Sequence, residues 1–245
     1  MKRDLFEALQ SARAAKRPVA LATDLDSGRQ ALVVDGAETA GDLQPSPELL
    51  SVIAEALQAD SSGRLKTPND SIFVQVFNPP LRLVVVGAVH LAQALVPIAQ
   101  LAGYEVTIVD PRGAWATQER FPNVEMSRDW PDDALRALEL DRRCAVVTLT
   151  HDPKLDDPAL AVALRSPAFY VGALGSTRTH AKRIERLREE GVSEEEIARI
   201  HAPVGLPIGA RAPSEIAIAI MGQITQVLRG APVLVKQDAA RESVA

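Results

Sequence analysis

The chain has 245 residues, 47% of them hydrophobic and 24% charged, which is enough for one large or two modest folded domains. A formal net charge of −5 with both signs interspersed, and an aromatic content of only 4%, argue against nucleic acid as a partner. No apolar run approaches the ~20 residues that cross a bilayer, and the first ten residues, MKRDLFEALQ, lack the apolar core of a secretory signal. We therefore expect a cytoplasmic protein that does not contact a membrane.

Residues 1–79 are predicted to form a small α/β domain. Its elements are helices over 4–16 and 48–58, and strands over 19–23, 30–34 and 72–77. The first two strands flank Asp26–Ser27–Gly28, a turn-forming sequence typical of a hairpin, and Ser46 is a suitable N-cap for the second helix. The last strand alternates apolar and polar residues, which favours an edge position, and Asn78–Pro79–Pro80 ends the domain.

A strand–helix–strand unit begins the second part of the chain. The mostly aliphatic run 81–86 ends at Gly87 and is typical of a buried parallel strand. A helix over 88–101 and a strand over 104–109 follow. Asp110 lies 23 positions after Gly87, close to the ~20 expected for the ribose-binding acid of a dinucleotide fold. The glycine pattern is incomplete, because Val89 replaces its second glycine and would obstruct the approach of a pyrophosphate.

Strands and helices continue to alternate up to residue 230. A short helical turn is predicted over 115–121. Further helices are predicted over 131–138, 156–164, 177–190, 193–200 and 213–228, with strands over 124–126, 145–150 and 168–171. This alternation predicts a doubly wound parallel sheet, a Rossmann-like α/β domain, over residues 80–230. Residues 231–245 are expected to be a flexible tail, and the single cysteine, Cys144, is expected to be a buried hydrophobe.

Histidines follow three of the predicted strands. His90, His151 and His180 each lie just beyond a strand, where ligands of such sheets collect. We expect them to cluster along one edge of the sheet. A transition-metal site built from these three side chains is an alternative interpretation, although the sequence has no helical His-Glu-x-x-His motif and no thiolate cluster.

Two loops in this region have the character of anion sites. Gly172–Thr177 carries two glycines before a helix that opens with Arg178 and His180. Positive charges are unfavourable at a helix N-terminus unless an anion is bound there. Gly209 and Arg211 precede the last helix in the same manner. Together with Asp110 and Arg112, these loops indicate a nucleotide or a phosphorylated cofactor. Thr150–His151–Asp152 either contacts that ligand or only caps the next helix.

Five segments in one order resemble a known family. They are VVVGAVHLAQAL, TIVDPRGAWATQERFP, VVTLTHDPKLDDPAL, YVGALGSTRTHAKRIERL and RIHAPVGLPIGARAPSEIAIAI. Together they resemble the Rossmann-like C-terminal domain of the xanthine dehydrogenase accessory factor family, the XdhC and CoxI family. The resemblance covers about residues 80–229.

The resemblance implies a maturation factor for molybdenum hydroxylases such as xanthine or carbon monoxide dehydrogenase. Members are thought to hold the molybdopterin cofactor or its dinucleotide, assist its sulfuration with a cysteine desulfurase, and deliver it to the enzyme. A homodimer is expected, because the last helix is apolar. The cofactor-binding positions implied by motif are Gly87, Ala88, Val89, His90, Asp110, Arg112, Thr150, His151, Asp152, Gly172, Gly175, Ser176, Arg178, Thr179, His180, Gly209 and Arg211. No catalytic residue or metal ligand is assigned.

Two other functions remain open from the residues. Gly87 and Asp110 would suit an NAD(P)-dependent oxidoreductase, although Tyr104 and Tyr170 lack the lysine four positions on that short-chain dehydrogenases use. A non-catalytic nucleotide-binding partner module is the second alternative. Residues 1–80 also lack the Gly-Ser-x-Pro-Arg and Gly-Gly-Cys segments typical of the family's longer N-terminal domain.

Overall fold

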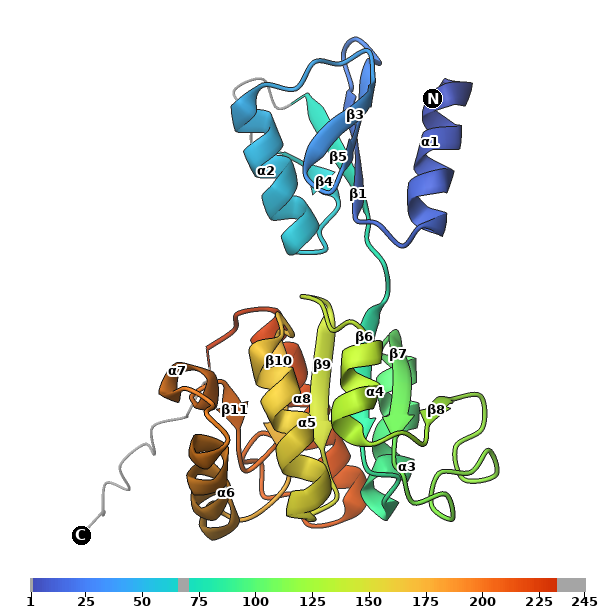
Figure 1. Cartoon of the computed structure of the whole chain (residues 1–245). Helices are drawn as coiled ribbons and strands as arrows, with labels where there is room; N and C mark the ends of the chain where they lie inside the picture. The colour runs from blue at the N-terminus through green and yellow to red at the C-terminus, as the bar shows by residue number, and fades with distance from the viewer. Residues whose placement is uncertain (1, 66–70, 233–245) are drawn as a thin grey trace, which may run out of the picture. The chain divides into compact units, whose positions relative to one another are not determined.

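A computed structural model describes residues 2–65 and 71–232 (Figure 1). The chain divides into two compact units, Met1–Pro79 and Pro80–Ala245, and each is described by itself below. The tail expected over 231–245 lies almost wholly outside the described residues. Among the described residues, no helix combines the length and the apolar composition that a membrane span requires.

The first unit is an antiparallel sheet with one helix on each face. Its elements are α1 (Arg3–Ala14), β1 (Val19–Asp24), β2 (Gln30–Val34), β3 (Ala37–Gly41), α2 (Pro47–Gln58), β4 (Gly63–Arg64) and β5 (Ile72–Phe77). Strand order is β3-β2-β1-β5-β4. The hairpin and the Ser46 cap are confirmed: β1 pairs with β2, and the Ser46 hydroxyl accepts a hydrogen bond from the Leu49 N–H at 3.3 Å.

The core of this unit follows the two-residue period of its strands. Val19 and Leu21 pack with α1, whereas Ala20 and Ala22 face the opposite side and pack with α2. The edge position predicted for residues 72–77 is wrong, because β5 lies between β1 and the two-residue β4. So short a strand leaves no periodicity in the sequence that could reveal it.

The second unit is built on a six-stranded parallel sheet. Its elements are β6 (Leu81–Val86), α3 (His90–Leu101), β7 (Tyr104–Val109), β8 (Glu125–Ser127), α4 (Pro131–Ala137), β9 (Cys144–Thr148), α5 (Pro153–Arg165), β10 (Tyr170–Ala173), α6 (Thr177–Glu189), α7 (Glu194–Ile197), β11 (Ile200–His201) and α8 (Pro213–Leu228). Strand order is β11-β10-β9-β6-β7-β8. When these strands are renumbered 1 to 6 in chain order and read from β8 to β11, the order is 3-2-1-4-5-6, that of the Rossmann fold. This confirms the predicted doubly wound fold.

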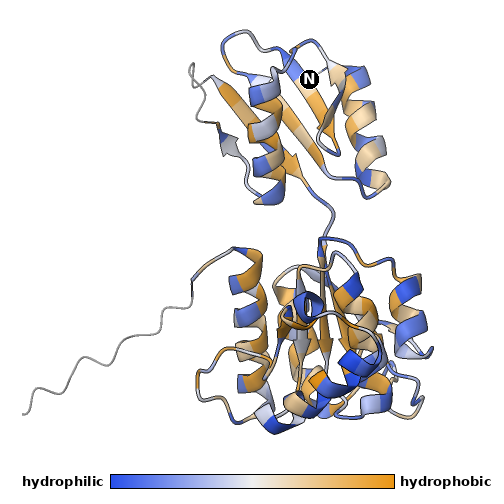
Figure 2. Cartoon of the chain, turned by 60° about the vertical axis from the view of Figure 1, so that its left-hand side comes forward, coloured by the Kyte–Doolittle hydropathy of each residue, from blue (hydrophilic) through white to orange (hydrophobic). Residues whose placement is uncertain are grey.

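Helices cover both faces of this sheet, as Figure 1 shows. Leu83 and Val85 face a core shared with α3 and α8, and Val84 and Val86 face a second core shared with α4 and α5. Because residues 83–86 of β6 are buried on both sides, they are continuously apolar rather than alternating. Figure 2 shows the same layering, with apolar strands enclosed by helices whose outer faces are polar.

The short helical turn predicted within residues 115–121 is present, since the Thr117 carbonyl accepts from the N–H groups of Arg120 and Phe121 at 3.1 and 3.0 Å. The strand β11 was not predicted, because two residues carry no pattern. On α6, the inward face contains Arg183 and Leu187, while Ala181 is exposed. Arg183 is thus a charged residue on the buried face of this helix.

Candidate functional site

The carboxyl-terminal edge of the parallel sheet contains most of the candidate residues. Strand order reverses between β6 and β9, and ligands of such sheets bind outside this switch point. Gly87 ends β6 with φ +112°, and a Cβ added there would lie 2.7 Å from Thr150 Cγ2 and 3.3 Å from the Thr150 backbone nitrogen. The loops after β6 and β9 therefore pack directly against each other, and only glycine fits at this contact.

Asp110, at the end of β7, is fully buried. Its carboxylate accepts hydrogen bonds from the Ala88 N–H at 2.8 Å and from the Arg112 guanidinium at 2.8 and 2.9 Å. Burial alone would raise the pKa of Asp110, but the bonds from Arg112 and from the Ala88 N–H hold that pKa below its usual value. In this conformation, both oxygens of the expected ribose-binding acid are engaged in orienting Arg112 and the glycine loop.

Arg112 and Arg120 lie on either side of Trp115 in the sequence and both contact its ring. Their guanidinium carbons are 5.6 and 5.5 Å from the ring centroid, and 47% of Trp115 is exposed. Arg120 also donates to the Ala88 and Trp115 carbonyls at 2.8 and 2.6 Å and to Gln93 Oε1 at 3.0 Å. Sequence reasoning missed Trp115 and Arg120, because the short helical turn expected over 115–121 gave no reason to bring them to the glycine loop.

The loop after β9 is held by Asp156 of α5. The Asp156 carboxylate accepts hydrogen bonds from the Thr150 hydroxyl at 2.6 Å and from the backbone N–H groups of Thr150 and His151 at 3.3 and 3.1 Å. Asp152 caps α5 by accepting from the Lys154 N–H at 3.0 Å. The N–H groups of Thr150 and His151 are thus bound by Asp156, and that of Asp152 by the Thr150 hydroxyl, so the capping interpretation of Thr150–Asp152 is the one the geometry supports.

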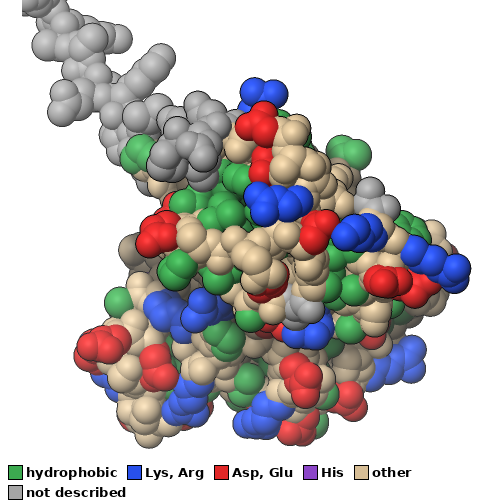
Figure 3. All heavy atoms as spheres, turned by 90° about the horizontal axis from the view of Figure 1, so that it is seen from above, with side chains coloured by type: hydrophobic (Ala, Val, Ile, Leu, Met, Phe, Trp, Pro, Cys, Tyr) green, Lys and Arg blue, Asp and Glu red, His purple; other side chains and the backbone are tan. Residues whose placement is uncertain are grey.

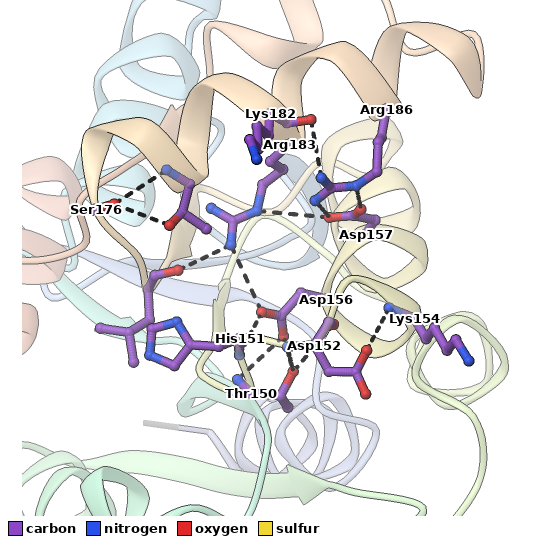
Figure 4. Close-up of polar contacts among 12 residues, drawn as sticks. Thr150, His151, Asp152, Lys154, Asp156, Asp157, Ser176, Lys182, Arg183 and Arg186 are labelled. Atoms are coloured by element: carbon purple, nitrogen blue, oxygen red, sulfur yellow. Dashed lines mark hydrogen bonds and ion pairs between the residues drawn. The ribbon is translucent and has the colours of Figure 1, made fainter.

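A buried arginine connects this loop to the loop after β10 (Figure 4). The side chain of Arg183 is 2% exposed and lies 3.8 Å from Asp156 and from Asp157, and it donates to the Leu174 carbonyl at 3.0 Å. Its Nε and Nη1 have no hydrogen-bond partner among the described residues. Burial lowers the pKa of Arg183 and raises that of Asp156, because both charges are removed from water.

The N-terminus of α6 retains the features expected of an anion site. Ser176 caps the helix by accepting from the Thr179 N–H at 3.2 Å, while Arg178 is exposed beside it. Gly175 has φ +142°, and a Cβ there would lie 3.2 Å from Thr179 and 3.8 Å from Arg183 Nη2. Gly172 is buried, and a Cβ on it would meet Val204 and Tyr170, so its role is packing rather than ligand contact.

The N-termini of α3 and α8 differ in how their backbone groups are satisfied. On α8, Glu215 accepts from the N–H groups of Arg211 and Ala212 at 2.8 and 2.9 Å, so the loop that contains Gly209 and Arg211 already has an anion of its own. On α3, the N-cap Val89 supplies no side-chain hydrogen bond, and the first helical N–H groups have no intrahelical acceptor. Of these two termini, α3 is the one suited to an external anion.

The four histidines do not form a metal centre. His90 and His151 are exposed, His180 is half-buried, and the His201 ring stacks on Tyr170 at a centroid distance of 4.7 Å. Within residues 2–65 and 71–232, no group of three or more His, Cys, Asp or Glu side chains is placed to hold a metal ion. Burial lowers the pKa of His180 and of His201.

Comparisons with known proteins match the parallel-sheet unit. A family model described as the XdhC Rossmann domain matches residues 83–224. The chain is 34% identical to the uncharacterized protein YqeB of Escherichia coli, over 73% of this chain and 32% of YqeB. It is 34% identical to the molybdenum cofactor insertion chaperone PaoD of E. coli, over 62% of this chain and 41% of PaoD. It is 31% identical to a Bacillus subtilis protein described as a probable xanthine dehydrogenase subunit, over 64% of this chain and 46% of that protein.

The chain thus spans less than half the length of these curated relatives. A crystal structure described as a xanthine dehydrogenase from Bacillus halodurans has the same fold, with a TM-score of 0.70 and 24% identity over 98% of this chain and 67% of that one. The family match covers more than half of the chain and agrees with the strand order and with the five sequence segments. The chain belongs to the XdhC family.

Proposed function

We propose that this protein helps to mature a molybdenum hydroxylase of the xanthine or carbon monoxide dehydrogenase type. In this proposal it binds the molybdopterin cofactor or its dinucleotide at the carboxyl-terminal edge of the parallel sheet and delivers it to the enzyme. Membership of the XdhC family and 34% identity to PaoD, which is described as a molybdenum cofactor insertion chaperone, support the proposal.

The structural observation that carries the proposal is the pair of helix N-termini on α3 and α6, whose first N–H groups have no intrahelical acceptor. Each follows a strand at the switch-point edge, and only β9 separates those two strands. The α6 terminus adds the exposed Arg178, and the α3 terminus adds Arg112 and Arg120 from the segment after β7. Phosphoryl groups are the ligands that helix N-termini and guanidinium groups bind together.

These residues fit a phosphorylated cofactor by the chemistry of their donors. Backbone N–H groups at Val89–His90 and Thr177–Arg178 would bind phosphoryl oxygens, and Arg178 and Arg120 would neutralise their charge. Such a cofactor supplies the dithiolene sulfurs that hold molybdenum. The chain itself would bind it, orient it and limit its contact with water.

Sulfuration, if this protein assists it, requires a thiol from elsewhere in the complex. Cys144 is the single cysteine of the chain; it is fully buried, and burial raises the pKa of its thiol to about 11. A thiol in this state is a poor nucleophile near neutral pH. We therefore propose that any sulfur comes directly from a cysteine desulfurase, with the chain presenting the cofactor.

The proposal is tested by mixing the purified protein with cofactor released from a molybdoenzyme and separating the mixture by gel filtration. We expect the cofactor to elute with the protein and Arg178→Ala to reduce retention. Arg211→Ala is the matched comparison, since it removes an arginine from a loop whose N–H groups, those of Arg211 and Ala212, are already bound by Glu215; it should reduce retention less. Absence of retention by the unmodified protein would reject the proposal.

An NAD(P)-dependent oxidoreductase has less support from the geometry. A ribose 2′-hydroxyl needs a carboxylate acceptor at the end of β7, and the two oxygens of Asp110 already bind Arg112 and Ala88. Calorimetric titration with NAD and NADP separates this function from the one proposed. A nucleotide-binding partner module without cofactor transfer would instead bind the client enzyme and no molybdopterin.

We also propose a homodimer. Ile208 and Ile218, before and on α8, are 58% and 55% exposed, and burying such side chains in a partner copy would be favourable. Light scattering during gel filtration measures the mass directly. A monomeric mass at tens of micromolar protein would reject this part of the proposal.

A further inference from the structure

We propose that Trp115, with Arg112 and Arg120 beside it, is a stacking surface for the planar heterocycle of an anionic ligand. The surface, which we call the Trp115 platform, comprises these three side chains. The inference rests on the proposed function only in taking a phosphorylated ligand at this edge of the sheet. It adds the part of the ligand that the helix N-termini do not explain, its ring.

The segment after β7 is anchored without the help of the indole. Ala116 and Phe121 are 0% and 1% exposed and join the core beneath α3, whereas Trp115 between β7 and β8 keeps 47% of its surface in solvent. The indole is half-exposed and has both guanidinium carbons within 5.6 Å of its ring centroid, which makes it well suited to bind another flat ring.

Hydrogen bonds fix the two arginines in position. Arg112 is held by both oxygens of Asp110. Arg120 donates to the carbonyls of Ala88 and Trp115 and to Gln93 Oε1. Since planar guanidinium groups held in this way lose little entropy when a ligand binds, the platform is preorganised.

The charge of the platform favours an anion. Arg112 is neutralised by Asp110, but within the described chain Arg120 hydrogen-bonds only to neutral oxygens. A third guanidinium, that of Arg128, lies beside Gly113, since a Cβ on that glycine would be 3.9 Å from Arg128 Cζ. A cationic surface around an exposed indole selects for an aromatic ring that carries a phosphate rather than for a neutral ring.

The platform also lies next to the expected phosphate position. Arg120 Nη1 bonds both the Trp115 carbonyl and the carbonyl of Ala88, which lies in the glycine loop two residues before α3. A phosphoryl group at the N-terminus of α3 would therefore lie beside the platform, and the ring attached to it could reach Trp115. Nucleotide bases and pterins share this chemistry.

The test uses a protein with a single indole. The chain has two tryptophans, so Trp130→Phe leaves Trp115 as the only fluorescent indole. In that variant, GMP is expected to quench the tryptophan emission and ribose 5-phosphate, which has no ring, is not. Titration with GMP, AMP and 6-carboxypterin by calorimetry then gives the preferred ring, which distinguishes a nucleotide base from a pterin.

Substitution of the indole completes the test. Trp115→Ala should weaken the best ring-bearing probe about tenfold, the loss expected for one base–aromatic stack, and should leave ribose 5-phosphate binding unchanged. Trp115→Phe should recover part of the affinity, and Trp130→Ala, the matched control for losing an exposed indole, should retain all of it. Urea unfolding of each variant checks that it is folded.

Two results would overturn the inference. One is a Trp115→Ala protein that binds ring-bearing probes as tightly as the Trp130→Ala protein. The other is the finding that no ring-bearing probe binds better than ribose 5-phosphate. Loss of cofactor retention in gel filtration would reject the proposed function but not the platform, because GMP quenching does not depend on molybdopterin.

Discussion

Two aspartate–arginine pairs at the same edge of the sheet show opposite designs. Asp110 is buried and bonds Arg112 at 2.8 and 2.9 Å, while 37% of the Arg112 side chain remains exposed. Asp156 and Arg183 are both buried, and their charged atoms remain 3.8 Å apart. The first pair presents an oriented cation to solvent. The second connects two loops inside the protein, so only the first can contact a ligand without rearrangement.

The largest expected effect comes from breaking the buried pair. Arg183→Met should lower the free energy of unfolding by about 3 kcal/mol, since it leaves Asp156 buried without its cation. Urea denaturation followed by tryptophan fluorescence measures this loss in the second unit alone, because both tryptophans belong to it. Asp156→Asn combined with Arg183→Met should recover part of the stability. Arg188→Ala, which removes an exposed pair with Glu194, should barely shift the urea midpoint of unfolding. If Arg183→Met shifted that midpoint no more than Arg188→Ala does, the buried pair would not have the expected importance for stability.

The contact between the two halves of the edge is the next target. Gly87→Ala should cost about 2 kcal/mol of unfolding free energy, because the new Cβ combines a positive φ with a clash against Thr150. Gly103→Ala is the matched control: it also has a positive φ, +87°, but nothing lies within 4 Å of its Cβ position. The excess loss at Gly87 measures the packing of the two loops. Equal losses of unfolding free energy for the two variants would show that the loops after β6 and β9 are not closely packed.

The pH dependence of stability should distinguish the two carboxylates. The pKa of Asp110 is lowered in the folded state, so its stabilisation is present above its unfolded pKa of about 3.9 and is lost as pH falls through the folded value. The pKa of Asp156 is raised by burial, so its contribution is present below about 3.9 and is lost as pH rises through the folded value.

The Asp110→Asn variant should therefore be less stable than the unmodified protein by about 1.5 kcal/mol near neutral pH, a loss that shrinks in acid. The loss caused by Asp156→Asn should instead grow as the pH falls from neutral toward about 4. Unfolding curves at several pH values provide the measurement. Parallel pH profiles for the two variants would refute the opposite assignments.

The smallest effect is expected at the helix cap. Ser176→Ala removes the acceptor for the Thr179 N–H and should cost about 1 kcal/mol of unfolding free energy. Phosphate affinity should persist, since the N–H groups of Thr177 and Arg178 are unchanged. Ser176→Asp keeps a cap but adds a negative charge, so it should preserve stability while weakening anion binding. If Ser176→Asp binds phosphate normally, the anion is not bound at α6.

The sequence was sufficient for the layers of the second unit. Continuous apolar runs mark β6 and β9 as strands buried on both faces, and glycine and proline mark the helix ends. The short strands β3, β4 and β11 were missed, because two to five residues without alternation do not differ from loop. Acidic and basic side chains are mixed over the face seen in Figure 3, in agreement with the interspersed charges of the sequence.

The site was less predictable, since its residues depend on contacts between distant segments. Asp110 was correctly placed at the end of a strand, but its engagement by Arg112, two residues later, was overlooked. Arg183 lies four residues before Leu187 on the inner face of α6, and the helical spacing could have revealed it. Arg120 gave no such signal: its partner Ala88 is 32 residues away, and only the folded chain brings them together.

That single arginine has a consequence for motion. The connection between β7 and β8 spans residues 110–124, contains no helix within the described residues, and is anchored in the core by the buried Ala116 and Phe121. Arg120 ties it to the backbone of the glycine loop at Ala88. When a ligand orders the glycine loop, the connection therefore loses less conformational entropy on binding another part of the same ligand.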